Sequence, residues 1–174
     1  GAGKSTTIKM LTGTLYPSSG KLEVNGEIPF KSSFLKRVEI LSVMNVSETR
    51  AMVADIPLNE NIAQFIRENR DRCYVVTGNL DIWISDLMQK LGLNGHVYCS
   101  RANYKNDKIT QVVSVIDKEL TAKQFVQPLV VVGDGDNDSG MAQVANISVG
   151  FGCIRDIAPS LIQNIDYAFY DDNR

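Results

Sequence analysis

The chain of 174 residues lacks the features that mark several large classes of protein. Its 18 lysines and arginines face 20 aspartates and glutamates, and the formal net charge of −2 gives no electrostatic basis for binding nucleic acid. No apolar run approaches the ~20 residues that span a bilayer, and the first residues contain no apolar stretch of the signal-peptide type. We therefore expect a cytoplasmic protein that neither binds nucleic acid nor inserts into a membrane.

Cysteine and histidine are scarce as well. The three cysteines, Cys73, Cys99 and Cys153, are widely spaced and form no C-x-x-C pair, so neither a disulfide framework nor a zinc site is predicted. The single histidine, His96, has no carboxylate or cysteine at ligand spacing, which favours a structural role. With 44% apolar and 22% charged residues, the composition is that of a globular protein.

Strand-like and helix-like segments alternate from about residue 73 onward. Short β-rich runs predict strands at 73–76, 96–100, 129–132, 146–151 and 166–170, and the intervening segments predict helices at 80–91, 107–120, 138–144 and 156–164. In the second of these helices, apolar residues recur at i, i+3, i+4 and i+7: Ile109, Val112, Val113 and Ile116. The alternation predicts an α/β fold with a doubly wound parallel sheet.

The segment before residue 73 divides into two parts. Apolar spacing after Pro57 predicts a helix at about 58–66, whereas residues 33–44 fit neither a helix nor a strand well. Nearer the start, a helix is predicted at about 5–15, and Asn25-Gly26 between apolar runs predicts a hairpin. We place a junction near 31–40 and predict two domains, residues 1–38 and 39–174.

The first six residues, Gly1-Ala2-Gly3-Lys4-Ser5-Thr6, match the second half of a P-loop. Such a loop cradles phosphates with its backbone N–H groups, its lysine and its hydroxyl. Gly1, Gly3, Lys4, Ser5 and Thr6 are therefore candidate nucleotide-binding residues, with ATP as the candidate ligand. Together with the run TTIKMLTGTLYPSSGKLEVNGEIPF, the motif resembles the nucleotide-binding domain of ABC transporters over about residues 1–38. That resemblance implies transporter subunits as partners.

The rest of the machinery for ATP hydrolysis is not in the sequence. The motif's first glycine is absent, and neither an LSGGQ-like signature nor a Walker B carboxylate pair follows. Without a second Mg²⁺ ligand and a carboxylate that orients water, ATP hydrolysis is not expected. The alternative for the glycine-rich start is a helix N-terminus that holds no ligand.

A cluster of carboxylates follows the predicted strand at 129–132, in the run Gly133-Asp134-Gly135-Asp136-Asn137-Asp138. In open α/β sheets, ligands bind at the carboxyl ends of parallel strands. We expect Gly133 and Gly135 to let the backbone turn sharply, which directs Asp134 and Asp138 to a hard cation such as Mg²⁺. An EF-hand is excluded because its sixth and twelfth positions hold Ser139 and Ala145. The alternative is an Asp-rich turn with a helix cap.

Two further groups are candidates for binding phosphate. Thr77-Gly78-Asn79 follows the predicted strand at 73–76 and offers a hydroxyl and N–H groups to an anion, although such a tripeptide is also common in turns. Lys108 opens the helix predicted before the Asp134 strand, with Lys105 as a competitor for the same role.

Together, these segments resemble motifs II, III and IV of the haloacid dehalogenase superfamily, particularly its phosphoserine-phosphatase-like members, over about residues 40–174. The resemblance implies a Rossmann-like core and Mg²⁺-dependent hydrolysis of a small phosphorylated metabolite. It also implies the roles of individual residues. Thr77, Gly78 and Asn79 would bind the phosphoryl group, Lys108 would neutralise its charge, and the metal set would be Asp134, Asn137 and Asp138.

One part of that family's pattern is missing. The nucleophile of the family lies in a D-x-D motif after the first core strand, but here D-x-D occurs only within residues 134–138. Asp55 follows a short apolar run without a second aspartate. We therefore expect a core without its first strand and impaired catalysis. Three classes of function remain: an impaired phosphatase, a nucleotide-binding module, and a non-catalytic remnant of a truncated or fused reading frame.

Overall fold

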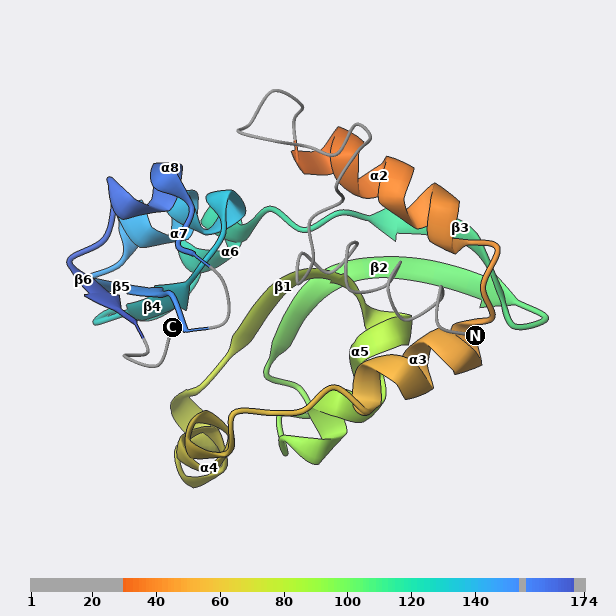
Figure 1. The fold of residues 1–174 in the computed structure, drawn as a ribbon, viewed down its shortest axis with the longest axis horizontal. Coiled ribbons are helices and arrows are strands. Elements are labelled where there is room, and N and C mark those ends of the chain that lie inside the picture. The colour runs from red at the N-terminus through yellow and green to blue at the C-terminus, as the bar shows by residue number, and fades with distance from the viewer. Residues whose placement is uncertain (1–29, 154–155, 171–174) are drawn as a thin grey trace. The chain divides into compact units, whose positions relative to one another are not determined.

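The computed structural model describes residues 30–153 and 156–170. The predicted P-loop, the helix at 5–15 and the hairpin at Asn25-Gly26 lie outside these residues. The described residues divide into two compact units, one of residues 34–116 and the other of residues 30–33, 117–153 and 156–170. Each unit has a three-stranded sheet (Figure 1).

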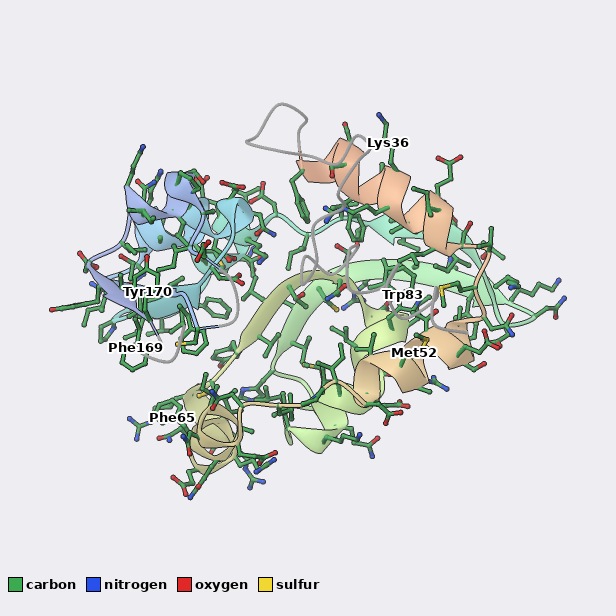
Figure 2. The ribbon with its side chains drawn as sticks, in the orientation of Figure 1. Lys36, Met52, Phe65, Trp83, Phe169 and Tyr170 are labelled. Atoms are coloured by element: carbon green, nitrogen blue, oxygen red, sulfur yellow. The ribbon has the colours of Figure 1, made fainter. Side chains whose placement is uncertain are left out.

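Four helices belong to the first unit or lead into it: α2 (Phe30–Leu41), α3 (Val46–Ala54), α4 (Glu60–Glu68) and α5 (Asp81–Lys90), with a short 3₁₀ turn, η1 (Arg70–Arg72). Helix α2 resolves the ambiguity of residues 33–44, and α4 confirms the helix predicted after Pro57. Helix α3 packs against α5, and the buried side chains of Val46, Trp83 and Ile84 form part of this core (Figure 2).

The sheet of this unit has the order β1-β2-β3, with β1 (Val75–Leu80), β2 (Val97–Lys105) and β3 (Lys108–Ser114). Strand β1 is parallel to β2, whereas β2 and β3 form an antiparallel hairpin. The helix predicted at 107–120 is therefore wrong. Asn106 and Asp107 have φ values of 51° and 63°, the positive values that a two-residue hairpin turn requires, and the β-branched residues after them suit a strand.

The second unit alternates strands and helices, as predicted. Its elements are α6 (Lys118–Ala122), β4 (Val130–Gly133), η2 (Asp136–Asp138), α7 (Ser139–Val144), β5 (Ile147–Phe151), α8 (Pro159–Ile162) and β6 (Tyr167–Phe169). The sheet order is β4-β5-β6 with every pair parallel, and the helices gather on one face (Figure 1). Ala142, Ile157 and Leu161 form a buried apolar cluster there.

Parallel strands joined by helices confirm the predicted α/β, Rossmann-like class. Helix α2 runs continuously from Phe30 to Leu41, and the predicted domain boundary after residue 38 stays a prediction. None of the helices in the described ranges, 30–153 and 156–170, is long and apolar enough to cross a membrane.

Candidate active site

The candidate metal-binding loop begins where β4 ends, at Gly133. Asp134 and Asn137 are half-buried, whereas Asp138 is 5% exposed at the end of the turn η2. Because β4 is parallel to β5, the loop lies at the carboxyl end of parallel strands, where α/β proteins bind their ligands.

Both carboxylate oxygens of Asp138 are engaged. Oδ2 accepts hydrogen bonds from the backbone N–H groups of Asp134, at 3.1 Å, and Gly135, at 3.0 Å. Oδ1 accepts from Lys118 Nζ at 2.6 Å, and the side chains of Asp138 and Lys118 are only 7% and 11% exposed, respectively. Charge-assisted bonds of this kind are among the stronger hydrogen bonds in proteins. Asp138 therefore fixes the backbone of the first aspartate of the motif, Asp134.

Gly133 is needed because Asp138 comes close to it. A Cβ atom built on Gly133 would lie 2.6 Å from Asp138 Cβ and 2.8 Å from Asp138 Oδ2. The chain does turn back here, but the turn does not use a left-handed backbone at these glycines. Gly135 has an ordinary φ of −109°, and positive φ among the described glycines is confined to Gly92 and Gly95.

Lys118 is the site residue that sequence reasoning missed. It is the first residue of α6, and the Asp117 side chain before it caps the helix by accepting from Leu120 N at 2.9 Å. The sequence signal for the start of this helix was Asp117, an aspartate of the kind that caps helices, ahead of β4. The assignment of residues 107–120 to one helix concealed that signal.

Lys108 belongs to the β2–β3 hairpin, so the prediction that it opens a helix is wrong. It is the first residue of β3, and its Nζ donates to Val43 O at 2.5 Å. The neighbouring Asp107 carboxylate accepts from Ser47 N at 2.9 Å and from Ser47 Oγ at 2.5 Å. These bonds hold the pKa of Asp107 below its ordinary value. The hairpin turn thus fixes the start of α3.

The candidate phosphate-binding residues form a bulge in β1. Thr77 pairs with Cys99 and Leu80 with Ser100, so Gly78 and Asn79 fall outside the β1–β2 register. The Thr77 hydroxyl accepts from Asn79 N at 3.2 Å. A bulge can re-aim a side chain, and the carboxyl ends of parallel strands are where α/β proteins bind their ligands. Whether this bulge and the Asp134 loop act in one site stays a prediction.

The donor chemistry of the Asp134 loop suits Mg²⁺. Carboxylate and amide oxygens are hard ligands, and Mg²⁺ keeps several waters and needs only one or two carboxylates from the protein. Among the described residues, no group of three or more His, Cys, Asp or Glu side chains could hold a metal ion. Of the predicted metal set, Asp138 is the residue that accepts from Lys118.

The histidine, the cysteines and Asp55 lie outside the candidate metal-binding loop in the sequence. His96 stacks on Tyr74 with ring centroids 4.8 Å apart, and its Nδ1 lies 3.2 Å from Cys73 O. Cys73, Cys99 and Cys153 are free cysteines. Asp55, which has no second aspartate of a D-x-D motif, is exposed at the end of α3.

Comparisons with known proteins agree with this architecture. A phosphoserine phosphatase of Methanocaldococcus jannaschii is 27% identical over 146 residues, which are 75% of this chain and 69% of that protein. A solved structure of substrate-bound phosphoserine phosphatase superimposes with a TM-score of 0.72 at 23% identity, over 97% of this chain and 82% of that chain.

The resemblance to ABC transporters is partial. A bacitracin transport ATP-binding protein of Bacillus licheniformis is 37% identical over 62 residues, only 36% of this chain and 19% of that protein. Binding of ATP by residues 1–6 therefore stays a prediction. The haloacid dehalogenase-like hydrolase model, in contrast, matches residues 19–143, most of the chain. The chain belongs to the haloacid dehalogenase-like hydrolase family.

Proposed function

We propose that this protein is a Mg²⁺-dependent phosphoric monoester hydrolase of the phosphoserine phosphatase type, with little turnover of its own. The observation that carries the proposal is the Lys118–Asp138 ion pair, which fixes the loop of Asp134 at the end of β4. The similarity to a phosphoserine phosphatase supports a small phosphorylated metabolite as the substrate.

In this proposal, the Asp134 carboxylate and the Asn137 side-chain oxygen hold Mg²⁺, and Asp138 is a positioning residue. When bound, the ion withdraws charge from the phosphoryl group and helps to orient it. Lys118 supplies a fixed positive charge beside Asp138. Without it, a nearly buried carboxylate would lack its cation. We therefore propose Lys118, rather than Lys108, as the lysine of this site, with the neutralisation of Asp138 as its task.

Thr77, Gly78 and Asn79 are proposed to bind phosphoryl oxygens. The Thr77 hydroxyl, which accepts from Asn79 N, still has its own proton to donate. The bulge frees Gly78 and Asn79 from the β1–β2 register. Support for this role comes from the local geometry of β1 alone.

Covalent phosphoryl transfer needs a nucleophile. The residues assigned so far only position the phosphoryl group and neutralise its charge. The sequence has no D-x-D pattern outside the loop of residues 134–138. We therefore expect this chain to hydrolyse phosphoserine or p-nitrophenyl phosphate slowly or not at all.

Titration calorimetry with Mg²⁺ tests the metal site. We expect weak binding that Asp134→Asn abolishes and Asp136→Asn leaves nearly unchanged, because the asparagine side-chain oxygen can still accept the hydrogen bond that Asp136 accepts from Ser160. Equal losses in the two variants would contradict the assignment of Asp134 as the ligand.

A further inference from the structure

The middle acidic residue of the loop, Asp136, is not part of the proposed metal set, yet its side chain has a specific partner. Asp136 is exposed, and its Oδ1 accepts from Ser160 Oγ of helix α8 at 2.5 Å. The same Ser160 hydroxyl accepts from Ser139 Oγ at 3.2 Å. The loop and α8 are thus joined by side chains 24 residues apart in the sequence.

A backbone bond joins the same two segments next to the metal ligand. Ala158 N, at the start of α8, donates to Asp134 O at 2.9 Å. The backbone of Asp134 is therefore held from both sides, its N–H by the Asp138 carboxylate and its carbonyl by Ala158. Asp138 is fixed in turn by Lys118, and Ala158 lies two residues before Ser160.

We infer that Asp136 and Ser160 form a latch that positions Asp134 through Ala158. The latch keeps α8 on the loop, and the Ala158 N–H then sets the position of the Asp134 carbonyl. This inference rests on the proposed function for its metal readout, but its structural part is measurable without metal. The competing explanation is that the buried side chains of Ile157 and Leu161 anchor this segment and that the exposed hydrogen bond contributes nothing.

Amide-resolved hydrogen exchange by NMR on the metal-free, full chain separates these explanations. Asp136→Ala and Ser160→Ala should each speed exchange of the Ala158 amide by about three- to tenfold, the range that one net hydrogen bond gives. The double variant should exchange no faster than either single variant, and Asp136→Asn should stay near the parent. The Gly152 amide, which donates to Phe169 O in the same unit, is the internal reference.

Gln143→Ala is the matched control variant, because it removes another exposed side-chain hydrogen bond of this unit, to Asn164, while the bonds from Ser160 to Asp136 and from Asn164 to Ser160 O keep both their partners. It should leave the Ala158 amide unchanged. Parent-like exchange of Ala158 in Asp136→Ala and Ser160→Ala would overturn the latch. The latch would also be overturned if the double variant multiplied the accelerations of the two single variants. It would likewise be overturned if the Gly152 amide exchanged faster by the same factor as the Ala158 amide.

Mg²⁺ titration of the same variants completes the test. We expect Asp136→Ala and Ser160→Ala each to weaken Mg²⁺ binding by about threefold, the lower end of what one net hydrogen bond gives, and Gln143→Ala to leave it unchanged. Accelerated exchange with unaltered Mg²⁺ affinity would contradict the positioning of Asp134. A parent chain that binds no Mg²⁺ at all would refute the proposed function instead, and hydrogen exchange would still decide whether the latch exists.

Discussion

Replacing Lys118 with methionine should strongly destabilise the unit that holds the candidate metal loop. Methionine keeps most of the side-chain volume but removes the ammonium group that lies 2.6 Å from Asp138. Asp138 would then be a carboxylate with 7% side-chain exposure and no cation. Breaking a buried ion pair by removing one partner typically costs about 3–5 kcal/mol. Because two backbone N–H groups still donate to Asp138, we expect the lower end, about 3 kcal/mol.

The thermal unfolding midpoint should fall accordingly. For a chain of this size, 1 kcal/mol shifts the midpoint by about 2–4 °C, so Lys118→Met should lower it by about 6–12 °C. A double-mutant cycle with Asp138→Asn isolates the interaction energy between the side chains of Lys118 and Asp138. The double variant should be more stable than the sum of the single losses predicts, by about 2 kcal/mol, because neither charge is then left alone.

Lys123→Met is the matched control. Lys123 contacts Glu119 at 2.5 Å in the same segment, but these side chains are 50% and 46% exposed. An exposed pair at this spacing contributes at most about 0.5 kcal/mol. Equal, small shifts in Lys118→Met and Lys123→Met, or additive losses in the cycle, would refute the argument that the Lys118–Asp138 pair fixes the loop.

Three further changes have defined outcomes. Gly133→Ala should lower the free energy of unfolding by about 1–3 kcal/mol in urea denaturation, because the new methyl group overlaps the clamped Asp138 side chain, and parent-like stability would contradict that overlap. Asp107→Asn should lower the thermal midpoint at pH 7. The folded-state pKa of Asp107 is depressed, so its stabilisation is present above about pH 4 and is lost as the pH falls through the folded-state pKa. A difference from the parent that is as large at pH 3 as at pH 7 would contradict this reasoning. Thr77→Val should weaken binding of inorganic phosphate by about threefold or more in the presence of Mg²⁺, while Thr77→Ser should bind as the parent does, and equal binding by the two variants would exclude the hydroxyl.

The strands of the second unit and the loop of Asp134 could be predicted because their signals are local. An apolar run of four residues followed by Gly-Asp-Gly marks a buried strand and the loop at its end, and β4 ends one residue later than predicted. The hairpin at Asn106 and Asp107 was missed because its β-branched residues also recur at helical spacing.

The contacts of the two lysines could not be predicted for a different reason. The bond from Lys108 to Val43 O and the ion pair of Lys118 with Asp138 join residues 65 and 20 positions apart, so local patterns do not reveal either of them. The close approach of Asp138 to Gly133 likewise exists only once the loop has folded back on the strand. Local sequence therefore predicted the loop of Asp134, whereas the pairing of Lys118 with Asp138 depends on a tertiary contact.

The central claim is that Asp134 and Lys118 belong to a phosphatase site that lacks a nucleophile. In the most direct test, a β-strand that ends in D-x-D-x-T is fused ahead of the predicted phosphatase domain, residues 39–174. Mg²⁺-dependent hydrolysis of p-nitrophenyl phosphate is then measured. We predict little or no turnover by the parent chain and appreciable turnover by the extended one. That turnover should be lost in Asp134→Ala and Lys118→Met and kept in Lys108→Met. Robust hydrolysis by the parent chain that disappears in Asp55→Ala, or loss of activity in Lys108→Met but not in Lys118→Met, would contradict the account.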